Sequence, residues 1–295
     1  MTTLQRRIGQ FSVSPIGLGA MPISFGDNER GDRARGTATV HAALDAGITL
    51  IDTADIYAPT WDSMGHNEIY VSEALASWSG DRSTITVATK GGITRSAGET
   101  WGRNSSRDYL RSRIEASLGY LGVDRLDLYY LHRPDRTILY ADVMETLASF
   151  KQEGLIAEIG ISNANVEEIG IAIDVLGEGG LAAVQNEFSP KFHHTSKPEL
   201  DYCQEHGVAF LPWSPLGGTA GGAKGVGKRF PVLAEIAEAR GVSPQQLTLA
   251  WELALAGNVI PIPGASRPET ITDSAKAMTL ELTADEVSRI SAAIF

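Results

Sequence analysis

An aspartate, a tyrosine, a lysine and a histidine stand where short apolar runs of the sequence end. Asp52 and Tyr57 lie in IDTADIYAP (51–59), Lys90 ends the run VATK, and His132 follows LYYL. A buried lysine needs an acidic partner, and a cation beside a phenol favours the phenolate and lowers the tyrosine pKa. We therefore expect Asp52 to pair with Lys90, and Tyr57 to donate a proton near neutral pH beside His132.

Each of these residues also has an ordinary structural explanation. A lysine at the end of a strand is usually solvated, a lone histidine is usually structural, and Asp52 could cap a turn. Their joint occurrence favours a site, because the ends of adjacent parallel strands lie at one rim of a sheet. Asp55, between Asp52 and Tyr57, is expected only to be solvated at that rim.

Polar or aromatic residues also end the later apolar runs. These residues are Ser162, Asn163, Gln185, Trp213, Ser214, Gly264, Ser266 and Arg267. Together with the first four, they place candidate site residues at the same end of seven consecutive runs, which is where catalytic residues collect in a parallel barrel.

Eight short aliphatic or β-branched runs alternate with stretches of helical spacing. The runs are 16–20, 50–53, 84–89, 126–131, 156–161, 182–184, 208–211 and 259–262; helices are expected over 32–46, 67–77, 107–121, 141–153, 166–176, 197–206, 231–239, 244–256 and 268–277. This alternation without a linker predicts an α/β fold, a closed (β/α)8 TIM barrel that forms a single domain over 1–295. An open doubly wound sheet is the alternative, but no GxGxxG follows the first run.

Local signals support these elements. Glycines at 47, 122, 154, 207 and 241 follow expected helices, where a left-handed residue is wanted, and Ser243-Pro244 has the residue types of a helix start. Ile8–Val13 is expected to form a hairpin across the bottom of the barrel. The glycine-rich stretch 215–228 predicts either a mobile backbone that closely approaches a ligand or a plain flexible connection.

Composition excludes several classes of function. The chain of 295 residues carries 25 basic and 36 acidic side chains, a formal charge of −11 without a long basic run, so nucleic-acid and anionic-membrane partners are not expected, and an anionic ligand would need a local positive pocket. The single cysteine, Cys203, excludes an intrachain disulfide and a cysteine-based zinc site, and no metal is expected. Neither a signal segment nor a transmembrane run is evident, which predicts a cytoplasmic protein.

The sequence resembles the aldo-keto reductase superfamily. IDTADIY, VATKGG, LDLYYLHRPD, GISN, VQNEFS, PWSPLGG and IPGASRPE match its motifs in order, over about residues 8–290. The resemblance implies a barrel that binds a nicotinamide dinucleotide without a Rossmann fold. It also implies that Asp52, Tyr57, Lys90 and His132 form a catalytic tetrad in which Tyr57 is the general acid, Lys90 with Asp52 lowers its pKa, and His132 orients the carbonyl.

The resemblance also assigns cofactor contacts. It implies that Ser162, Asn163 and Gln185 hold the carboxamide and that Trp213 lies beside the nicotinamide ring. It implies that the backbone of Ser214, Leu216 and Gly218 approaches the pyrophosphate and that Ser266 and Arg267 lie near the adenosine 2′-phosphate. It also implies that Gly264 binds the cofactor and that Asp273 stands where relatives hold the adenine. An arginine fork suits a phosphate, so NADPH is the expected cofactor and NADH the alternative.

The resemblance implies an oxidoreductase that transfers a hydride between NADPH and an aldehyde or ketone, or that oxidises an alcohol or sugar hydroxyl in reverse. Trp61, Met64 and Trp101, from two long loops, are expected to line the pocket for a small carbonyl or alcohol substrate. That pocket fits an aromatic aldehyde, a pyridoxal or a sugar equally, and the oligomeric state is left open. Two other functions stay open: a nicotinamide-sensing regulatory subunit with slow turnover, and a barrel hydrolase using Asp135 and Glu187.

Overall fold

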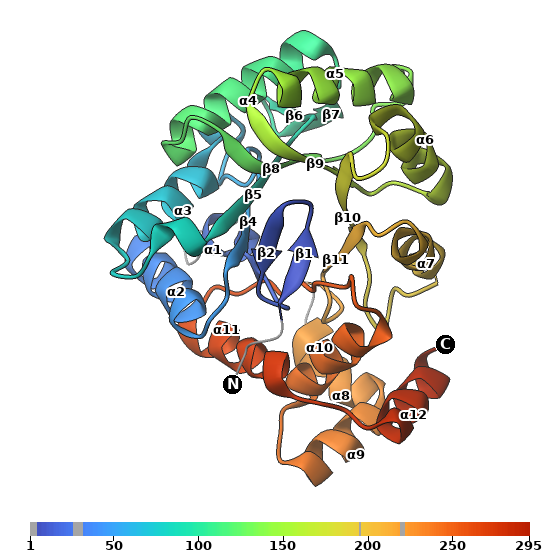
Figure 1. The fold of residues 1–295 in the computed structure, drawn as a ribbon. Helices are drawn as coiled ribbons and strands as arrows, with labels where there is room; N and C mark the ends of the chain where they lie inside the picture. The colour runs from blue at the N-terminus through green and yellow to red at the C-terminus, as the bar shows by residue number, and fades with distance from the viewer. Residues whose placement is uncertain (1–4, 26–31, 195, 219–221) are drawn as a thin grey trace.

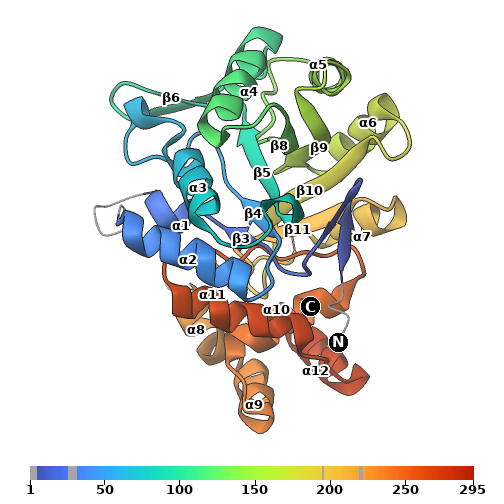
Figure 2. The same ribbon diagram turned by 60° about the vertical axis from the view of Figure 1, so that its left-hand side comes forward.

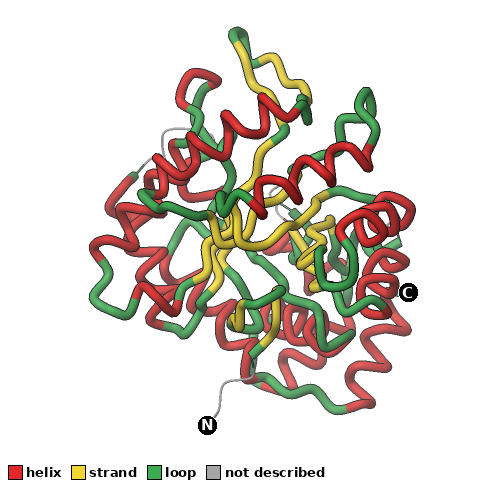
Figure 3. Tube along the Cα trace, turned by 45° about the horizontal axis from the view of Figure 1, so that its top comes forward, coloured by secondary structure: helices red, strands yellow, loops and turns green. Residues whose placement is uncertain are grey.

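Parallel strands form the centre of the molecule. The computed structural model describes residues 5–25, 32–194, 196–218 and 222–295. Its main sheet runs in the order β3 (Leu18–Gly19), β4 (Leu50–Asp52), β5 (Thr86–Gly91), β8 (Leu126–Leu131), β9 (Ile156–Ser162), β10 (Leu181–Glu187) and β11 (Ala209–Trp213). Helices surround these strands (Figures 1 and 3). The α/β barrel is therefore confirmed.

The eighth predicted run, 259–262, closes the barrel without forming a regular strand. Ile260 and Ile262 donate to Phe210 and Pro212 of the preceding strand at 2.9 and 3.1 Å. On the other side, Gly17 and Gly19 donate to Pro261 and Pro263, each at 3.0 Å. The two prolines have no N–H to donate in return, so half of that ladder is missing and only isolated bridges remain.

The outer helices follow the predicted order. They are α2 (Arg33–Asp45), α3 (His66–Ser77), α4 (Arg107–Leu121), α5 (Tyr140–Gln152), α6 (Val166–Leu176), α7 (Lys197–Glu205), α9 (Pro231–Arg240), α10 (Pro244–Leu255) and α11 (Pro268–Ala275). Helix α11 packs beside α2, which completes the ring (Figure 2). All five predicted post-helix glycines have φ between 65° and 89°, and the Ser243 side chain caps α10 by accepting from the Gln246 N–H. None of the helices in these ranges is long and apolar enough to span a lipid bilayer.

The glycine-rich stretch departs from its prediction. Residues 219–221 lie outside the described part, but Gly222–Arg229 form helix α8 rather than a loop. Val226 is buried, and α8 packs against α9 and α10. Tertiary packing thus overrides the low helix propensity of glycine. Gly222 lies so near Gly217 that a Cβ would come within 2.3 Å of its backbone, which explains a glycine at that point. The short helix α1 (Met21–Ser24) and the C-terminal α12 (Ala284–Ile294) complete the α-helices of the described residues.

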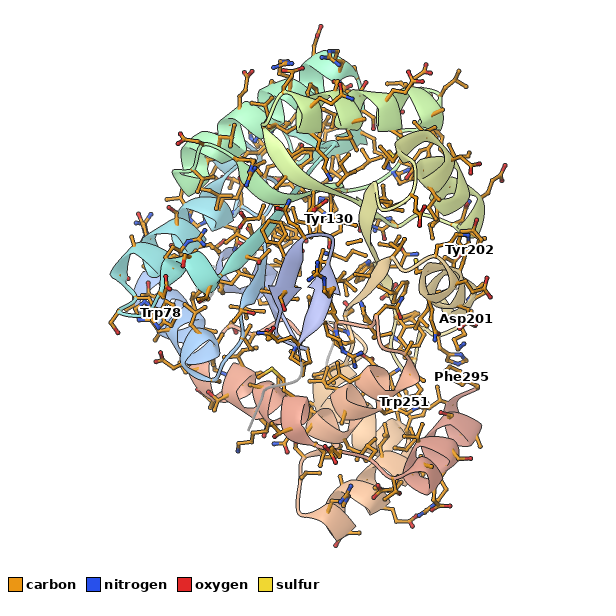
Figure 4. The ribbon with its side chains drawn as sticks, viewed as in Figure 1. Trp78, Tyr130, Asp201, Tyr202, Trp251 and Phe295 are labelled. Atoms are coloured by element: carbon orange, nitrogen blue, oxygen red, sulfur yellow. The ribbon has the colours of Figure 1, made fainter. Side chains whose placement is uncertain are left out.

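Two hairpins close opposite ends of the barrel. The predicted one, β1 (Arg6–Ile8) with β2 (Phe11–Val13), lies at the end where strands begin, because Gln10 N–H binds Glu158 near the start of β9 at 3.0 Å (Figure 1). A second hairpin, β6 (Ile93–Ser96) with β7 (Thr100–Arg103), follows β5 and was not predicted. Between the ends, the barrel is filled by side chains such as Tyr130 (Figure 4), so it is a core and not a pore.

Candidate active site

Lys90 is the centre of the site. It lies on β5 and is fully buried, and its ammonium group donates to the Asp52 carboxylate of the neighbouring β4. The same group donates to the Thr53 carbonyl at 2.8 Å and lies 3.5 Å from the Tyr57 hydroxyl. Burial opposes its charge, but the Asp52 carboxylate holds the pKa of Lys90 above its ordinary value. A charged lysine is therefore fixed between an acid and a phenol, as predicted.

His132 lies beside Tyr57. It directly follows β8, its N–H donates to Gly91 at 2.9 Å, and its ring meets the Tyr57 ring edge to face at 5.8 Å. Burial, with Lys90 and Arg133 nearby, holds the pKa of His132 well below its usual range. The imidazole is therefore neutral near pH 7, and its buried Nδ1 has no hydrogen-bond partner among the described residues.

The electrostatics of Tyr57 differ from the prediction. Lys90 does lower the pKa of Tyr57, but burial raises it by more, and the Asp52 and Asp55 carboxylates raise it further. The pKa of Tyr57 therefore lies above its ordinary value. In this structure Tyr57 is a protonated donor, and Lys90 acts by limiting how far burial disfavours the phenolate.

Three predicted residues on β9 and β10 join this network. Gln185 donates from Nε2 to the second oxygen of Asp52 at 2.7 Å. The Ser162 hydroxyl donates to the Gln185 carbonyl at 2.7 Å, and Asn163 donates from Nδ2 to the His132 carbonyl at 3.0 Å. These hydrogen bonds connect β9 and β10 to the tetrad, and the side-chain amide of Gln185 is already bonded to Asp52.

Two predicted cofactor residues have strained backbones. Asn163 and Ser214 have φ of 58° and 53°, and in the described ranges Glu99 is the one other non-glycine residue with positive φ. Such strain in non-glycine residues tends to cluster at ligand sites. β11 ends at Trp213, whose buried indole Nε1 lacks a partner among the described residues. Ser214 follows, and the Ser214 carbonyl accepts from the Gly217 N–H at 2.8 Å.

A cavity of about 400 Å³ adjoins that turn. Leu216 lines it with Gly217, α8 residues and Pro190, and its three charged lining residues are Lys191, Lys228 and Arg229. Gly218, with φ of 85°, continues the same turn. Although the formal net charge of the chain is −11, this cavity is the local positive pocket that an anionic ligand requires.

The last predicted cofactor residues lie around the start of α11. Gly264 forms an isolated β-bridge with Gly19. A Cβ on Gly264 would come within 2.9 Å of the Pro22 side chain. The Ser266 side chain is half-buried, and Arg267 is exposed at the helix N-cap. Asp273 accepts hydrogen bonds from the Ser243 hydroxyl and the Gln246 amide of α10, so both its oxygens are engaged within the protein. Its role toward adenine stays a prediction.

The three predicted pocket residues occupy different positions. Trp101 on β7 lies 6.4 Å from the Phe25 ring, which lies 6.1 Å from Tyr57, so Phe25 and Trp101 form a row that we call the aromatic wall. Met64 packs behind Tyr57 against Ala54, Ile56 and Ile93. Trp61 is exposed and donates from its backbone to Glu99 at the hairpin turn. Phe25 was not predicted.

Arg95, also missed from sequence, clamps the Tyr57 loop to the β6–β7 hairpin. Its guanidinium donates to the carbonyls of Ala58 and Pro59 at 2.7 and 3.1 Å and to Glu99 at 2.6 Å. It stacks on Trp101 at 4.8 Å. The spacing of Arg95 and Glu99 could have predicted their ion pair. The contacts of Arg95 with Ala58 and Pro59 could not be predicted, because they depend on the fold.

Asp55 is not solvated, contrary to its prediction. It is fully buried and accepts from Arg113 of α4 at 2.8 Å. Burial raises the pKa of Asp55 to about 6. The neighbouring Glu68, which accepts from Thr89 at 2.6 Å, has its pKa raised to about 7 by burial and by Asp55. Of these two buried carboxyl groups, Asp55 is paired with Arg113 and Glu68 is hydrogen-bonded to Thr89.

Glu68→Gln is expected to flatten the pH dependence of stability. A carboxyl group whose pKa is raised on folding binds more protons when folded, so its contribution to stability is complete below its unfolded pKa and is lost as pH rises through the folded value of about 7. Between pH 5 and pH 8, the unfolding free energy of the Glu68→Gln variant should therefore fall by less than that of the wild type, the difference being on the order of 2 kcal/mol. Urea unfolding of both proteins at the two pH values measures this. Parallel pH curves would show that Glu68 titrates normally.

Known proteins resemble this chain over most of its length. A sequence model of the aldo/keto reductase family matches residues 15–294. The 6-dehydroglucose reductase of Novosphingobium aromaticivorans is 34% identical over 280 residues, covering 92% of this chain and 90% of that protein. An aldo-keto reductase from Klebsiella pneumoniae, solved in complex with NADPH, superposes with a TM-score of 0.82 at 26% identity over 100% of this chain and 96% of that one. The glycerol dehydrogenase of Gluconobacter oxydans gives 0.82 at 26% identity, over 99% and 95%.

Proposed function

The chain belongs to the aldo/keto reductase family, and on that premise we propose that it reduces aldehydes and ketones with NADPH and catalyses the reverse alcohol oxidation. The observation that carries the proposal is the buried Lys90, which contacts both the Asp52 carboxylate and the Tyr57 hydroxyl while the neutral His132 lies against the Tyr57 ring. A charged group held next to a phenol in a water-poor site suits proton transfer to a carbonyl oxygen.

The side chains divide the reaction between them. When bound, NADPH supplies a hydride to the carbonyl carbon. The neutral His132 has one N–H to offer the carbonyl oxygen, which fixes the orientation of the substrate. Tyr57 transfers its hydroxyl proton to the same oxygen. The phenolate left on Tyr57 lies 3.5 Å from the Lys90 ammonium group, which stabilises it. The reverse reaction uses the same groups, with Tyr57 as base.

The residues present fit a nicotinamide dinucleotide. Lys191, Lys228 and Arg229 line the cavity beside the Ser214 turn, and their charge suits a pyrophosphate. Trp213, whose indole nitrogen lacks a partner among the described residues, and the strained Ser214 come just before Leu216 of that cavity, and the strained Asn163 donates to the His132 carbonyl. In our proposal Ser162, Asn163 and Gln185 hold the carboxamide, and Leu216 and Gly218 approach the phosphates.

A matrix of cofactors and substrates tests the proposal. Purified protein is assayed with NADPH or NADH against aldehydes and ketones, and with NADP⁺ or NAD⁺ against sugars and small polyols, since similar proteins are named for both kinds of substrate. We expect oxidation of NADPH in a one-to-one ratio with alcohol formed. Tight NADPH binding without turnover across the matrix would instead support the regulatory subunit.

Arg267→Ala is expected to weaken NADPH selectively. The Arg267 side chain is exposed, and its one ion pair in the described part of the chain is a loose one with Glu269 at 3.5 Å, so the guanidinium is available to a 2′-phosphate. Losing a charge-assisted hydrogen bond should raise the NADPH Kd about tenfold, with NADH changed by less than about twofold. Fluorescence titration measures both, and Arg289→Ala, which removes an exposed arginine from α12, is the control. Equal losses for the two cofactors would refute this role.

A further inference from the structure

Two arginines lie next to the tetrad without a role in the reaction described so far. Arg133 directly follows His132, and its side chain is half-buried. Arg103, at the end of β7, donates to the Pro134 carbonyl at 3.3 Å, so its guanidinium lies on the same 132–134 segment. The two positive groups are close enough that Arg103 lowers the pKa of Arg133, although burial lowers it more.

The β6–β7 hairpin directs Arg103 toward the site. Cross-strand partners in an antiparallel pair point to the same face, and the partners here are Ile93 with Arg103 and Arg95 with Trp101. Ile93 is buried against Ala54 and Ile56 of the Tyr57 loop. The face that carries Arg103 is therefore the face that covers the Tyr57 loop, and Arg103 follows Trp101 of the aromatic wall at the two-residue spacing of a strand.

Among the described residues, the guanidinium of Arg133 lacks a partner at contact distance, although the Glu187 carboxylate acts on it from farther away. Within the described ranges it forms neither an ion pair within 4 Å nor a hydrogen bond. Of the other described arginines that are at least partly buried, Arg95, Arg111 and Arg113 form ion pairs, and Arg6 and Arg82 donate to backbone carbonyls. A half-buried guanidinium without a partner is costly unless a ligand completes it. Because Arg133 directly follows His132, a substrate bound at His132 lies within reach of the Arg133 guanidinium.

We propose that Arg133 and Arg103 form an anion subsite, and that the preferred carbonyl substrates carry a carboxylate or phosphate group. This inference rests on the proposed reductase function and names its substrate class. The carbonyl lies at Tyr57 and His132, the body of the substrate packs on the aromatic wall of Phe25 and Trp101, and its anionic group binds the two guanidinium groups.

Two acidic residues oppose this preference, because the Asp135 carboxylate interacts with Arg103 and the Glu187 carboxylate interacts with Arg133. Glu187 ends β10, is half-buried, and interacts with Lys191 and Arg133 without an ion pair within 4 Å to either. Burial raises the pKa of Glu187, which weakens its repulsion of an anion. Removing this carboxylate should therefore shift specificity in the direction opposite to removing Arg133.

Matched substrate pairs test the subsite. The carboxylate arm compares kcat/KM for 4-carboxybenzaldehyde with that for its neutral methyl ester, and the phosphate arm compares glyceraldehyde 3-phosphate with glyceraldehyde. We expect the wild-type protein to favour the anionic member of at least one pair, and the pair that responds identifies the anion. Arg133→Gln should lower the anionic-to-neutral ratio about ten- to hundredfold, mainly through KM, and Glu187→Gln should raise it. Arg125→Gln, an exposed arginine just before β8 at the opposite end of the barrel, should leave the ratio unchanged.

The outcomes distinguish failure of the anion subsite from failure of the reductase function. Reduction of the neutral aldehydes without preference for either anionic member, or an Arg133→Gln ratio equal to that of wild type, overturns the subsite and leaves the reductase standing. No reduction of any of the four compounds in the presence of NADPH counts against the reductase itself, and the subsite falls with it. A ratio that falls equally in Arg125→Gln would assign the preference to overall charge, and it also overturns the subsite.

Discussion

Tyr57→Phe is expected to lower kcat for aldehyde reduction by a factor of about 10² to 10⁴ while NADPH binding stays within about threefold of wild type. The substitution removes the hydroxyl group that Lys90 contacts at 3.5 Å, and with it the proposed proton donor. It keeps the ring that meets His132 and Phe25, so the fold and the aromatic wall should persist. Steady-state kinetics and fluorescence titration of NADPH measure the two quantities.

Tyr202→Phe is the matched control for this change. Tyr202 lies on α7, outside the barrel (Figure 4), where its ring packs on His206. Loss of a hydroxyl group there should leave kcat unchanged. Aldehyde reduction by Tyr57→Phe at the wild-type rate would disprove the assignment of the proton donor, and loss of NADPH binding in the same variant would point to a structural effect instead.

The barrel and its rim could be predicted because both depend on local patterns. The apolar runs end where the strands leave the core, so Asp52, Lys90, His132 and Gln185 could be placed at one rim before any contact was known. The structure brings all four within one network. Even the run at 259–262 was placed correctly, although its prolines prevent a regular strand.

Residues whose role depends on distant partners could not be predicted. Asp55 appears solvated in its own segment, and only the packing of α4 brings Arg113 against it. Arg95 can donate to the Tyr57 loop only because the unpredicted β6–β7 hairpin packs against residues 56–59. The same limit applies to Tyr57, because sequence identifies the lysine that lowers its pKa but not the burial that outweighs it.

The second large effect is expected from Lys90→Met, which removes the charge but keeps an unbranched apolar chain. Asp52 would be left buried opposite a thioether, with Gln185 as its remaining side-chain partner. Removing one member of a buried ion pair costs about 3–5 kcal/mol, a large part of the total stability of a typical domain. Activity should fall at least as far as in Tyr57→Phe, because the phenolate also loses its neighbouring cation.

The pH dependence of this variant has a definite sign. Burial already raises the pKa of Asp52 in the wild-type protein, and Lys90 opposes that rise, so without Lys90 the pKa rises further and the folded state binds a proton more readily than the unfolded state. A raised acid pKa favours folding at low pH, and that contribution is lost as pH rises. The destabilisation of Lys90→Met relative to wild type should therefore be smaller at pH 5 than at pH 8 in urea unfolding.

A double variant separates the structural role of Lys90 from its catalytic role. Asp52→Asn combined with Lys90→Met removes both charges, so most of the lost unfolding free energy should return while activity stays low, because neutralising Asp52 cannot replace the cation beside Tyr57. Lys197→Met provides the contrast, since its exposed pair with Asp201 on α7 should contribute less than about 1 kcal/mol and nothing to turnover. If the double variant regained activity together with stability, Lys90 would act only by holding the barrel rim together, and its proposed electrostatic action on Tyr57 would be wrong.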